Sequence, residues 1–287
     1  MAEAPDPTAP AALVSEATLR ALVDFDAARQ RVRDRLAQLT DGPQLLRFFV
    51  HYASWNGHFA NGVSALSSLL GGSRSLFREE GFPRAVADRS NYIASYFFDA
   101  ARDEYDDHIN PARDSHRCMA QAALISMKDH LGLSDAALEE DEPAELVTVN
   151  DNVLVGYTGQ PAAAEGRAAQ AFWAIGYHLG SELLADQEFS LIDEHLRKHH
   201  NDLVQHLMRS TVHLAGGTHR CYAWVGVHSG HGGAVEADHF DYALEGAHNA
   251  LRFLVGGDTA TAVRALQNGF CAFERDHARF FGISAAG

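Results

Sequence analysis

The chain has 287 residues, 46% of them hydrophobic and 21% charged, and its formal net charge is −15 because 38 acidic residues outnumber 23 basic ones. This composition supplies a packed core and excludes a collagen-like, disulfide-knotted or disordered chain. The negative charge argues against binding to nucleic acid or to an anionic membrane surface, because both attract basic proteins.

Cysteine and histidine usage narrows the kind of site that the chain can build. Cys118, Cys221 and Cys271 are far apart and form no Cys-x-x-Cys pair, so neither a thiolate zinc site nor a disulfide framework is predicted. The 17 histidines are an unusually high number for this length. Metal binding through imidazole is therefore a hypothesis to test.

The N-terminal 14 residues carry Ala-Pro and Asp-Pro steps, and we expect them to be a flexible terminus in front of one helical domain, residues 15–287. They lack the basic-then-apolar order of a signal peptide, and no uncharged apolar run approaches the length that spans a membrane. The sequence therefore predicts a soluble, cytoplasmic protein.

Apolar side chains recur at three- and four-residue spacing along most of the chain, which is the pattern of amphipathic helices. Glycine and proline punctuate the pattern, and the stretch 132–164 is the least regular. Alternating β-branched residues are nearly absent. The prediction is a single all-α domain of about seven or eight helices, at about 15–39, 44–70, 83–107, 112–131, 164–184, 187–208, 222–255 and 259–281.

The strongest chemical signal is a Glu-x-x-His pair, Glu236 and His239, in a late helix. Residues three apart on a helix project from one face, so both side chains can reach a single ion. Glu245 and His248 repeat the spacing nine residues later. Two more histidines precede the first pair, at positions 228 and 231.

Three earlier residues extend this signal. Glu104 ends the third predicted helix and His116 begins the fourth, so an antiparallel helix pair would bring them together, and Glu182 is embedded in an apolar helix. Singly, each has a plainer explanation: a helix-capping segment at 114–116, and a carboxylate that faces water at position 182. Their order supplies mixed carboxylate and imidazole ligands to one interior, a set that suits iron or manganese.

These segments together resemble the heme-oxygenase-like diiron oxidases, seven-helix proteins related to heme oxygenase, to TenA-type thiaminases and to the cofactorless oxidase of pyrroloquinoline quinone synthesis. Residues 44–52 are similar to the family's aromatic second helix, 103–116 to its Glu-then-His pair, and 172–188 to the helix with the middle Glu. The family's late motif is His-x-x-x-Asp/Glu-x-x-His. Its first position is Gly232 here, so we assign His231, shifted by a π-bulge among the glycines, with His228 as the alternative.

The resemblance implies two iron ions and dioxygen as a co-substrate. The expected function is a non-heme diiron oxidase that N-oxygenates an amine or cleaves a carbon–carbon bond of an amino or fatty acid, with an external electron donor as a partner. The six implied metal ligands are Glu104, His116, Glu182, His231, Glu236 and His239. Tyr52, Trp55 and Phe59 are candidates for the substrate pocket, although an aromatic helix face more often belongs to the core. The apolar faces of the first two predicted helices favour a homodimer.

Three other functional classes share features with this sequence. A ferritin-like diiron bundle needs Glu-x-x-His motifs on two different helices, whereas both pairs here fall on one predicted helix. A cofactorless or thiaminase-like relative stays open, but a TenA-type enzyme needs a nucleophilic cysteine, and Cys118 and Cys221 lie in apolar helical surroundings that suit inert thiols. A non-enzymatic helical scaffold also stays open, and it leaves the ordered Glu and His series unexplained.

Overall fold

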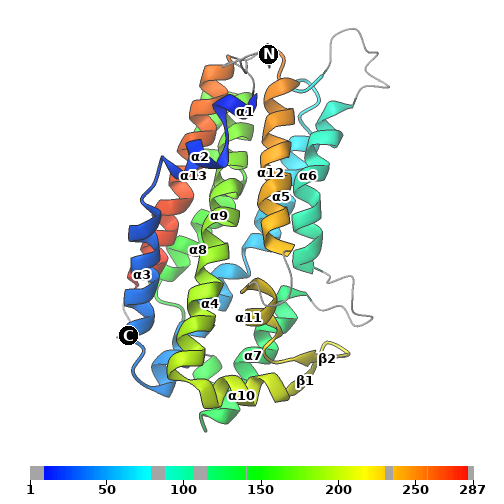
Figure 1. The fold of residues 1–287 in the computed structure, drawn as a ribbon. Coiled ribbons are helices and arrows are strands. Elements are labelled where there is room, and N and C mark those ends of the chain that lie inside the picture. Colours follow the sequence, from blue (N-terminus) through cyan, green and yellow to red (C-terminus); the bar gives the residue numbers. More distant parts are fainter. Residues whose placement is uncertain are drawn as a thin grey trace, which may run out of the picture.

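The computed structural model describes residues 10–78, 88–105, 115–139, 141–229, 235–256 and 258–283. This part of the chain is helical apart from one small antiparallel sheet (Figure 1). The all-α prediction is confirmed, although there are more helices than the seven or eight predicted. The elements are α1 (Pro10–Leu13), α2 (Glu16–Arg20), α3 (Phe25–Ala37), α4 (Gly42–Asn56), α5 (Phe59–Gly71), α6 (Arg89–Tyr105), α7 (His116–His130), η1 (Asp135–Leu138), α8 (Ala144–Tyr157), η2 (Gln160–Glu165), α9 (Arg167–His199), α10 (Asn201–Arg209), β1 (Thr211–Leu214), β2 (Gly217–Arg220), α11 (Ala223–His228), α12 (Val235–Arg252) and α13 (Thr259–Gly282).

Capping residues explain why two predicted helices are each divided. The Asp24 side chain accepts a hydrogen bond from the Ala27 amide, so a new helix, α3, begins inside the predicted 15–39 segment. Gly57 ends α4, and α5 begins two residues later. In both places the apolar spacing continues across the break, which is why periodicity alone predicted one helix.

Helix α9 is longer than predicted. It runs for 33 residues and joins the two helices expected at 164–184 and 187–208, before α10 begins at Asn201. Residues 211–220 form the β1–β2 hairpin, which the sequence did not predict. Ala215 and Gly216 make its turn with positive φ angles of 47° and 81°. Strands of four residues are too short to produce a clear alternation.

Helix α9 runs through the middle of the helical bundle (Figure 1). It packs along α13 and contacts α3, α8, α11 and α12. Two glycines permit the closest approach: a Cβ on Gly176 would lie 1.8 Å from the Leu266 carbonyl oxygen, and one on Gly269 would lie 2.0 Å from that of Trp173. Backbone therefore touches backbone where α9 crosses α13.

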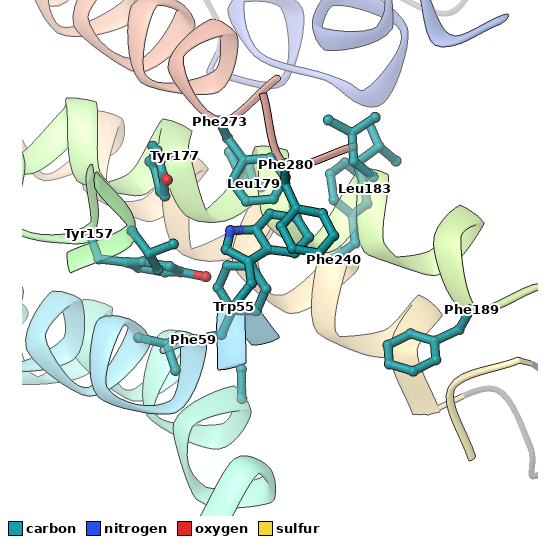
Figure 2. Packing of buried hydrophobic residues seen from close by; sticks show 14 of the residues in the cluster. Trp55, Phe59, Tyr157, Tyr177, Leu179, Leu183, Phe189, Phe240, Phe273 and Phe280 are labelled. Carbon is teal, nitrogen blue, oxygen red and sulfur yellow. The ribbon is translucent and has the colours of Figure 1, made fainter. Parts of the chain in front are cut away.

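Aromatic rings from α4, α9 and α13 fill the core beside this crossing. Figure 2 shows the Trp55 indole against the Phe280 ring, with their centroids 4.4 Å apart and their planes 10° apart. Tyr52 is equally buried and contacts both Trp55 and Phe280. Ring stacking of this kind adds to the free energy gained by removing apolar area from water.

The N-terminal segment is described from Pro10, and residues 1–9 lie outside the described residues. Helix α1 contacts α12, Val14 is buried, and the Val14 carbonyl accepts a hydrogen bond of 2.7 Å from His248 Nε2. Residues 10–14, which the sequence assigned to a flexible terminus, are thus anchored on the domain. Among the described residues, no helix has the length and apolar character needed to cross a membrane.

Candidate metal centre

Five helices bring predicted ligands to one place. Glu104 lies at the end of α6, His116 at the start of α7, Glu182 within α9, His228 at the end of α11 and His239 in the first turns of α12. Figure 1 shows the lower ends of α6 and α12 meeting the upper end of α7 beside α11. All five side chains line a single cavity of about 40 Å³. Since a water molecule needs about 10–15 Å³ measured in this way, the cavity has room for a few atoms only.

Local capping sets the direction of His116. The Ser115 hydroxyl accepts a hydrogen bond from the Cys118 amide, so α7 begins at His116 and its imidazole leaves from the first turn. The His116 Nδ1 atom lies 3.0 Å from Glu104 Oε2. The buried Nδ1 nevertheless has no hydrogen bond of acceptable geometry. The two atoms are therefore close together but are not aligned for a hydrogen bond.

Hydrogen bonds fix the orientation of His239. Its Nε2 atom lies 2.9 Å from Asp103 Oδ2, and its Nδ1 atom lies 4.0 Å from Glu182 Oε2. A carboxylate only accepts hydrogen bonds, so Nε2 carries a proton, and Nδ1 offers a lone pair to a metal ion when the ring is neutral. Burial opposes the charged ring, but Asp103 and Glu182 outweigh it and raise the pKa of His239. Carboxylates that orient a metal-binding imidazole in this way are common in metalloproteins. Asp103 directly precedes Glu104 in the sequence, but this role was not predicted.

His228 is oriented in the same manner by a backbone group. Its Nδ1 atom donates to the Trp224 carbonyl at 2.6 Å, which leaves Nε2 as the lone-pair nitrogen. The ring stacks on Phe189 at 4.3 Å and lies edge-on to His116 at 4.4 Å. Burial lowers the pKa of His228 well below its usual value, with the neighbouring His116 adding to the effect. The neutral imidazole is the form that binds a metal ion.

Glu182 is the second carboxylate that lines the cavity. Burial raises its pKa to about 7, and the nearby Glu104 adds to the shift, whereas His239 and His116 oppose it. Its Oε1 atom lies 3.4 Å from Nδ1 of His178, one helical turn earlier in α9. Sequence reasoning missed His178, although a His four residues before a Glu on an apolar helix is a detectable signal.

The donor set fits the metals that the resemblance implies. Two carboxylates and three imidazoles line one buried cavity, and mixed oxygen and nitrogen ligands suit iron or manganese. In the described part of the chain, no group of three or more His, Cys, Asp or Glu side chains has an arrangement that could hold a metal ion without moving. The carboxylates instead approach imidazoles in pairs, Glu104 with His116 and Glu182 with His178.

Two implied ligands cannot be placed in this arrangement. His231 and Gly232 lie outside the described residues, and Glu236 belongs to the first turn of α12, where side chains are not described. The second Glu-x-x-His pair lies elsewhere. Glu245 accepts a hydrogen bond of 3.1 Å from the Tyr96 hydroxyl, and neither it nor His248 lines the cavity.

Of the three aromatic residues suggested for a substrate pocket, Phe59 lines the cavity. Tyr52 and Trp55 are not among the lining residues and pack in the aromatic core. Tyr157, which the sequence did not single out, does line the cavity, and its hydroxyl lies 2.7 Å from Ser181 Oγ. Figure 2 shows this hydroxyl turned toward Trp55 and Phe59.

The cysteines offer no activated nucleophile at this cavity. Cys221 is fully buried, and burial raises the pKa of its thiol. Cys118 and Cys271 are partly buried, and none of the three lines the cavity. A thiolate is the nucleophilic form, so a raised pKa argues against a TenA-type role for Cys221.

Comparison of the sequence with models of known protein families gives no match, and comparison with curated proteins gives none either.

Proposed function

We propose that this protein is a non-heme diiron oxidase of the heme-oxygenase-like type, which uses dioxygen to oxidise a small molecule. The observation that carries the proposal is the meeting of Glu104, His116, Glu182, His228 and His239 from five helices at one buried cavity. Burial of so many ionisable groups costs free energy that an apolar core would not lose. Groups with strongly shifted pKa values in a cleft are a common mark of a functional site.

The surrounding residues support the same role. Asp103 accepts a hydrogen bond from His239, and the Trp224 carbonyl accepts one from His228, so both rings are held in fixed orientations at the cavity wall. Phe59, Val63 and Phe189 are among the apolar residues that line the rest of the wall. Glu104 and Glu182 would bind or bridge the ions, and two ferrous ions held there would supply the activation of dioxygen.

The cavity is too small for both metals and a substrate as it stands. We therefore expect the cavity to widen when metal ions and substrate bind. Glu236 and His231 are the remaining ligands that the resemblance implies. The substrate decides whether the reaction is N-oxygenation or carbon–carbon cleavage. An external electron donor would supply the electrons needed for the next catalytic cycle.

Anaerobic titration with ferrous iron tests the proposal. We expect the wild-type protein to bind about two equivalents, and Glu182→Ala and His239→Ala to lower this number while the protein stays folded by circular dichroism. Glu245→Ala is the matched control, since this residue shares the Glu-x-x-His spacing on α12 but does not line the cavity. A fully folded wild-type protein that binds no iron would refute the proposal and leave a cofactorless or scaffold role.

A further inference from the structure

A second cluster of polar groups lies inside the aromatic core, apart from the metal cavity. It consists of Tyr52 on α4, Glu188 on α9 and His277 on α13, whose exposed fractions are 0%, 2% and 1%. The Tyr52 hydroxyl donates to Glu188 Oε2 at 2.8 Å, and His277 Nε2 lies 3.1 Å from Glu188 Oε1. None of the three lines the metal cavity.

Stability does not account for this cluster. Removing a carboxylate and an imidazole from water costs free energy that their mutual attraction often fails to return, and apolar side chains of the same size would pack there without that cost. The His277 ring packs against the rings of Trp55 and Phe281. The cluster therefore has the composition of a functional site.

Aromatic contacts connect Tyr52 to the metal cavity. The Tyr52 ring centroid lies 5.6 Å from that of Trp224 and 5.3 Å from that of Phe189. Phe189 stacks directly on His228, and the Trp224 carbonyl accepts the His228 proton. On the other side, Trp55 lies 6.1 Å from Tyr52 and 5.2 Å from Phe59, which also lines the cavity. Figure 2 shows Trp55 beside Phe59, with Phe189 farther away.

A phenol can lose an electron at moderate potential only if its proton leaves as well, because the oxidised phenol is a strong acid. A carboxylate already hydrogen-bonded to the hydroxyl is the base that this step needs, and a nearby imidazole stabilises the carboxylate. A neutral indole radical is a stronger oxidant than a tyrosyl radical. An electron therefore passes from tyrosine to the indole radical when the two rings are close.

We propose that Tyr52, Glu188 and His277 form a redox-active tyrosine site that donates one electron toward the metal cavity through Trp224. Tyr52 loses one electron and becomes a neutral radical, its hydroxyl proton passes to Glu188 Oε2, and an oxidant generated from dioxygen at the cavity gains the electron. An external one-electron donor and the same proton restore the phenol. The role rests on the proposed function, and it protects the protein when the cavity is oxidised without a substrate.

Two other buried tyrosines show why Tyr52 is the one assigned. The Tyr177 hydroxyl also donates to a carboxylate, Asp276, at 3.0 Å, but its ring contacts are Tyr157 and Phe273 rather than a tryptophan. Tyr222 donates to Asp193, and the Arg197 guanidinium lies over its ring at 5.5 Å. A positive charge on the ring face opposes the loss of an electron.

The metal-free protein tests the redox site independently of iron. Photoionisation of the tryptophans should give an indole radical whose decay is matched by the rise of a tyrosyl radical in transient absorption. Tyr52→Phe, which keeps the ring and its packing, should abolish that rise. Glu188→Gln should also lose it, because the amide cannot take the proton. Tyr177→Phe is the matched control and should leave the rise intact. An unchanged tyrosyl yield in Tyr52→Phe would overturn the inference.

The iron-loaded protein tests the connection to the cavity. With iron content measured first, exposure to dioxygen without substrate should give a tyrosyl signal by electron paramagnetic resonance that is lost in Tyr52→Phe. Peptide mapping of that variant should show more oxidation at residues around the cavity. If iron binds and dioxygen is consumed but the variant behaves as the wild type, the connection is refuted and the oxidase proposal stands. If no iron binds, the oxidase proposal and the connection both fail, and the photoionisation result still decides the redox site.

Discussion

The contact between α9 and α13 makes a demanding prediction for Gly176→Ala. The added Cβ would lie 1.8 Å from the Leu266 carbonyl oxygen, whereas ordinary contacts of a Cβ begin at 3.4 Å, so the two backbones must separate by about 1.6 Å. Overpacking costs up to about 3 kcal/mol, and rigid backbone on both sides puts this site at the upper end. Alanine returns about 1 kcal/mol through its helix propensity. We expect a net loss of about 2 kcal/mol in the free energy of unfolding.

Urea denaturation followed by circular dichroism measures this loss, with the slope of the transition checked for constancy. Gly226→Ala in α11 is the matched control, because its Cβ would meet only Tyr222 Cδ1 at 3.8 Å. There the propensity gain should prevail, so the control should be as stable as the wild type or up to about 1 kcal/mol more stable. A Gly176→Ala protein as stable as the wild type would show that the crossing is looser than described and would refute the reasoning.

Three further predictions concern charge and metal binding. Burial lowers the pKa of His195 to about 4 from the usual value of 6.5. The unfolded chain therefore binds this proton more tightly, and acid favours unfolding between these pH values. The His195 ring is partly exposed, so solvent screens part of this effect, and His195→Gln should reduce the acid-induced loss of stability by about 1–2 kcal/mol. Urea denaturation at several pH values measures this. A stability difference between variant and wild type that stays constant with pH would contradict the prediction. Asp103→Ala should weaken ferrous iron binding by about 10–100-fold, and Asp103→Asn, which keeps an acceptor for His239, should weaken it less, as measured by anaerobic calorimetry. His228→Ala should lower the iron stoichiometry; if only His231→Ala does so, the ligand is His231.

The helical class and the meeting of the main candidate ligands could be anticipated from the sequence. The short segment between Glu104 and His116 limits how far apart they can lie, and the structure brings them within 3.0 Å. Glu182 was a candidate ligand because it is a carboxylate embedded in an apolar helical segment. The structure brings His239 to within 4.0 Å of this carboxylate. The approach of Glu104 to His116 was expected from one short connection, a relation that a sequence expresses directly, whereas the meeting of Glu182 with His239 was implied by the family resemblance alone.

Relations between distant segments were not visible. Tyr52, Glu188 and His277 come from three helices, and nothing in the spacing of any one of them indicates a partner. The choice between His228 and His231 depends on how the chain passes the glycines after α11, where no helical period applies. The orientation of His228 by the Trp224 carbonyl also needs the folded backbone, because the sequence does not show which carbonyls are free.

The sequence predicted one helix ending near 184 and another beginning near 187, whereas α9 is continuous through these positions. Polar side chains are exposed on average, but the Glu188 side chain is buried and accepts a hydrogen bond from Tyr52. Helix α9 passes through this position without a break. Glu182 and Glu188 are six residues apart, which turns them by about 120° around the helix. One carboxylate therefore faces the metal cavity and the other the aromatic core. A single continuous helix fixes both, so a displacement of α9 at Gly176 should disturb iron binding and the tyrosine site together.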